Sequence, residues 1–377
     1  MFRKHKYINF DHNATTPPTR HVLAVLRKIY REGYNNPSAA YFGAQKTAGA
    51  IERARQQVAT ALGCDYNEII FTSGASESNS LIASNFNLKI DKKSHHSLLS
   101  GDWDTNHMIL DYEYGEMRHY VKDTTYMALP MIVSETGECL IDEVNSNPTK
   151  QYFLDLTQAI GKVQINLHSM PNVMFASASG HKFGGILGCG ILYINKNFNK
   201  KDKIRPLIYG TQENNLRGGT YNVPAIICFG EAIEEATQNI NKNQEQINKI
   251  IDYIYSYLED NYKSYYKNND DGTSFVKVVF NELKFRKHYN TINITFNNLL
   301  ATTAVQIFNK YGIYISAGSA CSSGEEKPSS AYLASGYTYD EAMRTIRISV
   351  GINNTIREAK KFVKILQKII DNYDISC

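Results

Sequence analysis

One lysine stands where an apolar run ends and a glycine-rich run begins. Lys182 closes the segment Ser179-Gly180-His181-Lys182, which follows the predicted strand at residues 173–176. A lysine amine at a strand end, flanked by small residues, can form a Schiff base with an aldehyde cofactor. The glycines of residues 183–190 let the backbone pass close to a bound ligand. A loose hairpin with a solvated lysine explains this segment equally well when it is taken alone.

A carboxylate ends the preceding apolar run, at residues 152–154. Asp155 could pair with a pyridinium nitrogen, which needs an anion to stay protonated and electron-withdrawing. Gln158, three residues later, can donate a hydrogen bond to a phenolic oxygen of the same ring. The alternative is that Asp155 caps the N-terminus of a helix, which is a common role for aspartate.

A phosphate-binding arrangement is predicted earlier in the chain. Residues 68–72 (EIIFT) form a short apolar run, Ser73-Gly74 follows, and residues 75–86 can be helical. A strand, a glycine turn and a helix start bring backbone N–H groups and a positive helix end to one point, which suits a phosphate.

The elements that must position these residues alternate along the chain. Apolar residues recur at helical spacing over residues 46–62, and Gly63 follows as a stop signal. Short apolar runs at residues 131–133, 152–154, 173–176 and 190–194 predict strands. Alternating strands and helices indicate an α/β architecture with a mostly parallel sheet.

The C-terminal third has a different pattern. One long helical stretch begins near Pro224, residues 291–296 (TINITF) alternate as a strand, and residues 355–373 form an amphipathic helix. We expect a large domain at residues 13–260, and a smaller α+β domain formed by residues 1–12 and 261–377.

Composition excludes several classes of protein. The chain has 377 residues and a net charge of +4, with 42% apolar and 21% charged residues, which is ordinary for a soluble globular protein. We therefore expect no direct nucleic-acid binding. No apolar run is long enough for a membrane span, and no secretory signal is evident. The six cysteines form no CxxC pair, so we expect reduced thiols, no metal site and a cytoplasmic location.

Six segments together resemble one known family. They are similar to the pyridoxal 5'-phosphate (PLP)-dependent cysteine desulfurases of the class V aminotransferase superfamily, particularly the iron–sulfur-assembly type. They occur in the family's order and span nearly the whole chain. The resemblance implies the PLP-dependent transferase fold, similar to that of aspartate aminotransferase. The segments are Asp11-His12-Asn13-Ala14-Thr15-Thr16-Pro17, Asn36-Pro37-Ser38, Phe71-Thr72-Ser73-Gly74-Ala75-Ser76-Glu77-Ser78-Asn79, Ser179-Gly180-His181-Lys182, Arg217-Gly218-Gly219-Thr220 and Gly318-Ser319-Ala320-Cys321-Ser322-Ser323.

The resemblance implies how the cofactor is held. Lys182 would bind PLP and later remove the substrate Cα proton, Asp155 would pair with the ring nitrogen, and Gln158 would bond the ring oxygen. Thr220 would reach the phosphate in a neighbouring subunit, which implies a homodimer. The phosphate would be cradled by Ala75, Ser76, Ser179 and His181.

The resemblance also implies how L-cysteine is handled. Arg347 would grip the substrate carboxylate with its planar fork, although a structural salt bridge is the alternative. Asn13 would lie at the substrate. His95 matches the histidine that stacks on the cofactor ring and shuttles protons, with His96 as the adjacent competitor. Cys321, among glycine and serine neighbours, would be the nucleophilic thiol that takes the sulfur and passes it to an acceptor protein.

The chain also departs from the family pattern. Ser134 stands where an asparagine usually helps to hold the ring oxygen or the substrate carboxylate. Leu156, Tyr41 and Thr211 replace a small residue, a histidine and a glycine. These departures indicate a divergent member.

The expected reaction is removal of sulfur from L-cysteine, which yields L-alanine and a persulfide on Cys321. Two alternatives stay open: another PLP reaction, such as that of a selenocysteine lyase or an aminotransferase, and a non-catalytic scaffold in a sulfur-transfer assembly. The sulfur acceptor is left open by the sequence, among iron–sulfur cluster assembly, tRNA thiolation, thio-cofactor synthesis and DNA phosphorothioation.

Overall fold

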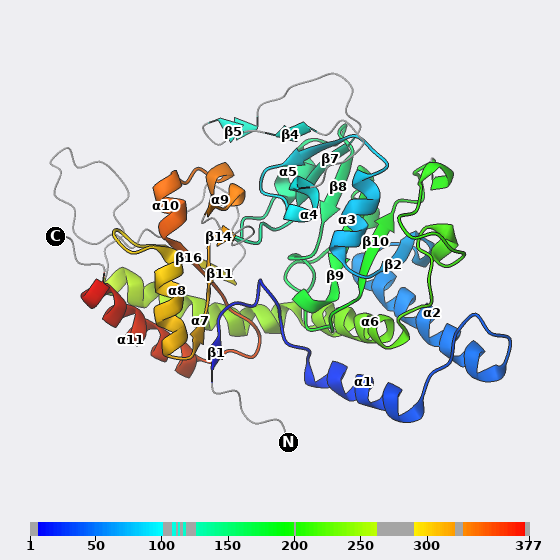
Figure 1. Cartoon of the computed structure of the whole chain (residues 1–377), viewed down its shortest axis with the longest axis horizontal. Coiled ribbons are helices and arrows are strands. Elements are labelled where there is room, and N and C mark those ends of the chain that lie inside the picture. The colour runs from blue at the N-terminus through cyan, green and yellow to red at the C-terminus, as the bar shows by residue number, and fades with distance from the viewer. Residues whose placement is uncertain are drawn as a thin grey trace.

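A seven-stranded sheet forms the centre of the larger part of the molecule (Figure 1). The computed structural model describes residues 7–100, 108–110, 112–113, 116–117, 126–199, 201–261, 290–320 and 327–373. The strand order is β2-β10-β9-β8-β7-β3-β4, and only β10 runs against its neighbours. The strands are β2 (Ile69–Thr72), β3 (Leu88–Asp91), β4 (Met108–Leu110), β7 (Tyr126–Pro130), β8 (Tyr152–Asp155), β9 (Val173–Ser179) and β10 (Gly190–Ile194). The predicted α/β fold with a mostly parallel sheet is confirmed.

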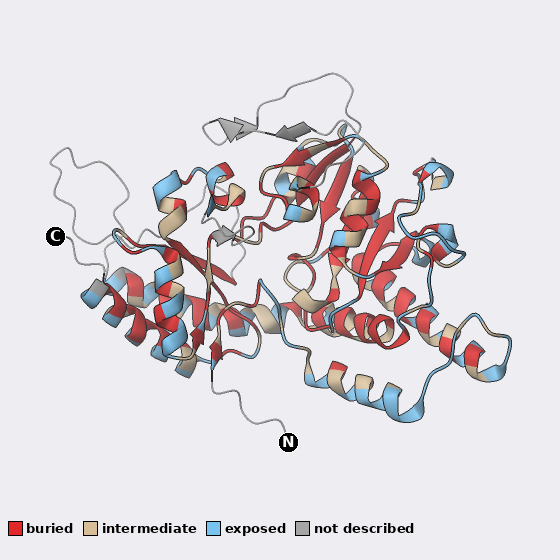
Figure 2. Cartoon of the chain, in the orientation of Figure 1, coloured by how far each residue is buried: buried red, intermediate tan, exposed pale blue. Residues whose placement is uncertain are grey.

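Helices cover both faces of this sheet. Successive strand residues point to opposite faces, so Leu154 packs in one core cluster and Phe153 in the other. The Leu154 face is covered by α1 (Arg20–Glu32), α2 (Phe42–Leu62), α5 (Ile141–Ser146) and α6 (Val223–Gln238). The Phe153 face is covered by α3 (Ala75–Ala83) and α4 (His96–Leu99). Figure 2 shows strands β2, β3 and β7–β10 and the inner helix faces largely buried, while much of α1 is exposed.

The helix predicted at residues 46–62 shows why these elements form. Ile51, Ala54, Val58 and Leu62 recur at helical spacing and are all buried in α2. Gly63 ends the helix with a φ of 62°, a left-handed conformation that glycine adopts without steric cost.

A second core lies around a three-stranded antiparallel sheet of order β11-β16-β13. Ile8 and Phe10, from the N-terminal segment, pack into this core with the helices of the C-terminal part. Its strands are β11 (Thr291–Thr295), β13 (Ser316–Ala317) and β16 (Thr345–Ser349), and a parallel pair joins β1 (Ile8–Asn9) to β12 (Ile313–Tyr314). Its helices are α7 (Ile240–Asn261), α8 (Ala301–Lys310) and α11 (Ile356–Tyr373), with α9 (Ser330–Ala334) and α10 (Tyr339–Arg344) nearby.

Short paired strands complete the described strands and α-helices. They are β5 (Tyr112–Glu113) with β6 (Glu116–Met117), and β14 (Ser319–Ala320) with β15 (Lys327–Pro328). Within the ranges described above, no helix is both long and apolar enough to cross a membrane.

Two sequence-based expectations about elements differ from the structure. The single helix expected from Pro224 is two helices, α6 and α7, separated at Asn239. A strand was expected at residues 131–133, but the strand in this region, β7, ends at Pro130. Within residues 131–133, Ile132 forms an isolated bridge to Cys139. The apolar face of α7, which was placed in the large domain, packs in the second core. The domain boundary near residue 260 stays a proposal.

Candidate active site

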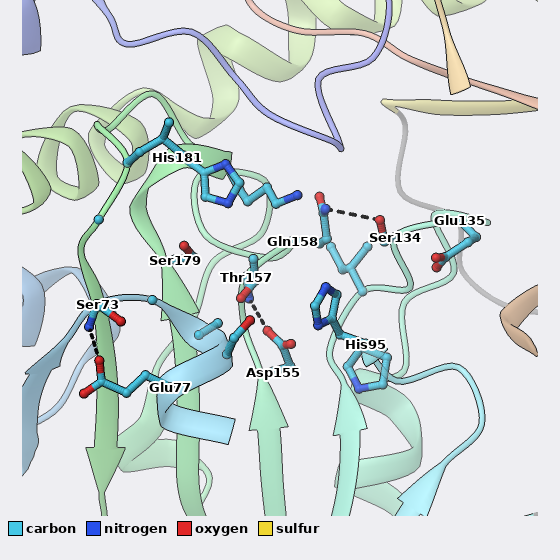
Figure 3. Close-up of a pocket in the computed structure, with 18 of the residues that line it drawn as sticks. Ser73, Glu77, His95, Ser134, Glu135, Asp155, Thr157, Gln158, Ser179 and His181 are labelled. Atoms are coloured by element: carbon cyan, nitrogen blue, oxygen red, sulfur yellow. Dashed lines mark hydrogen bonds between the residues drawn. The ribbon is translucent and has the colours of Figure 1, made fainter. Parts of the chain in front are cut away.

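The carboxyl ends of five strands of the large sheet meet at one cavity. Strands β2, β3, β7, β8 and β9 run in the same direction, and the residues at or after their ends line a cavity of about 370 Å³. Ligands of open α/β sheets bind at this edge. Figure 3 shows Asp155, Gln158, His95 and His181 reaching toward this cavity from different elements.

Lys182 lies in this cavity, in a short 3-10 turn directly after β9. Its Nζ donates to the backbone oxygens of Asn13 at 2.7 Å and Ala14 at 2.6 Å. Burial and the nearby Arg347 cation lower the pKa of Lys182 to about 8. A lysine with such a pKa has a larger neutral fraction near physiological pH than a free lysine, and the neutral amine is the nucleophile.

Asp155 ends β8 and lines the same cavity with only 8% of its surface exposed. Its Oδ1 accepts a hydrogen bond from the backbone N–H of Thr157 at 2.9 Å. The chain after Asp155 forms turns, so the carboxylate caps no helix. It remains a buried anion at the cavity wall, which suits a cationic ring nitrogen.

The amide of Gln158 is held from several sides. Its Nε2 donates to the backbone oxygen of Asn13 at 2.8 Å and makes a longer contact of 3.4 Å with Ser134 Oγ. Its Oε1 accepts from Lys162 Nζ at 2.8 Å. Gln158 and Ser134 both line the cavity.

His95 lines the cavity, and His96 is absent from its wall. His95 Nδ1 accepts from the backbone N–H of Ser97 at 3.1 Å and lies 2.9 Å from Ser97 Oγ. Ser97 Oγ in turn accepts from Asn79 Nδ2, and Asn79 Oδ1 accepts from Ser177 Oγ. Because a backbone N–H can only donate, Nδ1 carries no proton in the neutral ring and Nε2 carries it.

The start of α3 forms the polar end of the cavity. Ala75 and Ser76 lie in its first turn, whose N–H groups have no partner within the helix. Ser179 and His181 line the same cavity. Burial and the nearby cations lower the pKa of His181 to about 4, so its ring is neutral at pH 7.

A close backbone approach builds this polar end. A Cβ added at Gly190 would lie 2.4 Å from the Cα of Gly74, so β10 can only pass the turn before α3 if it begins with glycine.

Arg347, Asn13 and Thr220, which were predicted at the site, are not part of the cavity wall, and their predicted roles stay proposals. Arg347 forms an ion pair with Asp11 at 2.9 Å and bonds Ser134, so the salt-bridge alternative describes its present contacts. Asn13 lies beside it, behind the cavity wall, and bonds Ser134 O at 3.0 Å. Thr220 is exposed. Cys321 lies outside the described residues.

Two lysines near the site carried no signal in the sequence. Lys93 lines the cavity and forms a buried ion pair with Glu138 at 2.8 Å. Lys162 bonds Gln158 and Asn13 from behind the wall. Glu138 lies 45 residues from Lys93 and Asn13 lies 149 residues from Lys162, so a local pattern identifies neither of these two contacts.

The sheet, the lysine, the buried carboxylate and the helix start define a PLP-dependent enzyme of the transferase fold. The Aminotransferase class-V family model matches residues 8–110 and 110–362. The chain belongs to the class V aminotransferase family, and the family and PLP dependence predicted from the sequence are confirmed.

Similar proteins carry a narrower description. Cysteine desulfurase IscS of Methanosarcina thermophila is 29% identical and covers 97% of this chain and 93% of its own length. A NifS-like protein from Rickettsia africae is 28% identical, with a TM-score of 0.80, over 97% of this chain and 99% of that one. A structure of SspA in complex with cysteine is 27% identical, with a TM-score of 0.70, over 92% and 100% of the two chains.

The residues of the cavity fit PLP. Its volume lies within the range of about 300–1,000 Å³ that small-molecule sites occupy. Asp155 offers an anion for the ring nitrogen, Lys182 an amine for the aldehyde, and the first turn of α3 offers N–H donors for the phosphate.

Proposed function

We propose that the chain is a cysteine desulfurase that takes sulfur from L-cysteine onto Cys321 and releases L-alanine. The convergence of Lys182, Asp155 and His95 on one cavity carries the proposal. Relatives named cysteine desulfurase over nearly the full chain, and a similar structure with cysteine bound, support the choice of substrate.

Three residues would hold the cofactor and control its electronic state. When bound, PLP supplies an electron-withdrawing ring that stabilises negative charge at the substrate Cα. Asp155 would supply the anion that the ring nitrogen needs, and Gln158 would donate an N–H to the ring oxygen. Lys182, with its pKa near 8, is neutral often enough to bind the aldehyde and later to accept the Cα proton.

Two further residues would move protons and hold the substrate. His95 presents Nε2 as the ring nitrogen that is free to exchange a proton, because Nδ1 is engaged by Ser97. Arg347 would bind the substrate carboxylate by exchanging its contact with Asp11 for the ligand.

Cys321 would attack the substrate sulfur as a thiolate. The carbon–sulfur bond of cysteine breaks, an S–S bond forms on Cys321, and alanine leaves with the proton given up by the thiol. The persulfide then requires an acceptor thiol or sulfur-acceptor protein. A homodimer, a cytoplasmic location and an unidentified acceptor belong to this proposal.

Turnover of L-cysteine by the purified, PLP-loaded protein tests the assignment. We expect alanine and enzyme persulfide in equal amounts in the first turnover. Cys321→Ala should lose both products while it keeps the visible absorbance of lysine-bound PLP. Cys139→Ala, which removes another cysteine thiol, is the matched control and should keep both. Unchanged alanine formation by Cys321→Ala would refute the assignment and favour a different PLP reaction.

A further inference from the structure

Lys162 lies directly behind the wall of the candidate active site. It lies in the turn after β8 and lines a second cavity of about 290 Å³, which also borders Lys182. Gln158 lines the first cavity, so the Lys162–Gln158 contact joins the two cavities through the wall.

The amine of Lys162 contacts the side-chain oxygens of two amides. It lies 2.8 Å from Gln158 Oε1 and 3.0 Å from Asn13 Oδ1. A lysine ammonium can only donate, and a neutral amine still has two N–H groups. Both protonation states therefore satisfy both oxygens.

These contacts determine where the N–H groups of Gln158 point. With Oε1 held by Lys162, Nε2 faces the opposite side, where one N–H bonds Asn13 O at 2.8 Å. Among the residues that the structure describes, the other N–H makes only the long, 3.4 Å contact with Ser134 Oγ, so it can donate to a ligand in the first cavity. A donor at Oε1 also polarises the amide and strengthens its N–H groups as donors.

We propose that Lys162 is a positioning residue for the cofactor: by holding the amide oxygens of Gln158 and Asn13, it directs the second N–H of Gln158 toward the PLP ring oxygen. The inference rests on the proposed PLP site and adds to it a residue that contacts neither cofactor nor substrate. Burial, Lys182 and Arg347 lower the pKa of Lys162 to about 7, and the hydrogen-bond arrangement above is the same on either side of that value.

Titration of the apo-protein with PLP tests this inference without measuring turnover. Lys162→Met removes both donors from a side chain of similar length. We expect its PLP dissociation constant to rise about two- to tenfold, the net effect of one hydrogen bond. We also expect a change in the pH at which the absorbance of lysine-bound PLP titrates. Lys242→Met, on an exposed lysine that lines the same second cavity, should match the wild type in both measurements.

A double-mutant cycle separates positioning from a general effect on folding. If Lys162 acts through Gln158, Lys162→Met should weaken PLP binding far less in a Gln158→Leu background than in the wild type. Equal effects in the two backgrounds would overturn the inference. Lys162→Arg keeps N–H donors and should recover part of the affinity. Where Lys162→Met does not fold by circular dichroism, Lys162→Gln serves in its place, because its shorter chain cannot span both oxygens.

PLP binding by the wild type distinguishes failure of the proposed function from failure of the role of Lys162. A wild-type protein that shows no lysine-bound PLP absorbance removes the proposed function, and this inference with it. A wild type that binds PLP, with a Lys162→Met variant of the same affinity and the same absorbance titration, overturns only the role of Lys162.

Discussion

Burial and neighbouring charged side chains set the pKa of the reactive lysine. Lys182 shares its surroundings with Arg347 and Lys162, and Asp155 and Asp11 oppose them. Burial and Arg347 outweigh the carboxylates of Asp155, Asp11 and Glu135, so the pKa of Lys182 falls from 10.5 to about 8. The neutral amine is the reactive form, so a lower pKa makes Lys182 reactive at a lower pH.

The pH dependence of PLP capture checks this balance. The rate at which the apo-protein binds PLP should rise with pH and reach half its maximum near pH 8. Arg347→Met removes a cation that lowers the pKa of Lys182, so its midpoint should move to higher pH. Stopped-flow absorbance across pH 6–10.5 measures both curves, with Arg344→Met, an arginine outside the cavity wall, as the control. A midpoint unchanged by Arg347→Met would show that Arg347 exerts no field on Lys182.

Local signals revealed some site residues and missed others for a physical reason. Lys182, Asp155 and Gln158 lie at or just after strand ends, and such positions can be recognised from short apolar runs. The contacts of Arg347 with Asp11 join residues 336 positions apart, and those of Lys162 with Asn13 join residues 149 apart. Such pairs depend on how the two cores pack, which no local pattern encodes.

At the scale of elements, a strained turn leads into the segment Arg217-Gly218-Gly219-Thr220. Glu213, Asn214 and Asn215 all have positive φ values, of 49°, 57° and 65°. Non-glycine residues adopt this conformation at a cost and need surrounding contacts to hold it. The buried Glu213 carboxylate supplies them, since it accepts two hydrogen bonds from Arg55 and one from the Phe71 N–H.

Removing this carboxylate should destabilise the protein strongly. Glu213→Ala leaves the buried Arg55 guanidinium without its main partner and should lower the free energy of unfolding by about 3–5 kcal/mol. Glu52→Ala removes the exposed partner of the same arginine and should cost at most about 1 kcal/mol. Urea unfolding monitored by circular dichroism measures both. Equal losses for the two variants would contradict an anchoring role for Glu213.

Elements with a strong pattern were predicted well, and those set by tertiary packing were not. Helix α2 and strands β8, β9 and β10 coincide with the expected runs because their apolar spacing is clear. The break at Asn239 was missed because the apolar spacing continues from α6 into α7, although the two helices serve different cores. The residues after Pro130 are apolar because they pack in the core beyond the end of β7, so apolar character alone misplaced that strand.

At the scale of the whole molecule, two large apolar side chains are exposed, one at the cavity and one beside the segment that ends at Thr220. Leu187 lines the cavity and is 72% exposed, and Tyr209 is 77% exposed. Tyr209 adjoins the segment that ends at Thr220, since a Cβ added at Gly218 would lie 2.2 Å from the Tyr209 carbonyl oxygen. Exposed apolar side chains next to a predicted subunit contact fit an interface with another chain. The resemblance to cysteine desulfurases predicts that this other chain is a second copy, which delivers its Thr220 to the phosphate end of the cavity.

Mixing two inactive variants tests whether each site is shared between copies. Lys182→Ala has no amine for PLP, and Thr220→Asp places a negative charge against the neighbour's phosphate, so each homodimer should be inactive. In a mixed dimer, the copy that keeps Lys182 receives an intact Thr220 from the Lys182→Ala copy, so one of its two sites is complete. With random pairing, half of the dimers are mixed, and the refolded mixture should regain about a quarter of the wild-type alanine formation.

If Thr220→Asp is inactive because it damages its own copy's site, no site in any dimer is complete and the mixture stays inactive. The mixture therefore tells a Thr220 that acts across the dimer from one that acts within its own chain.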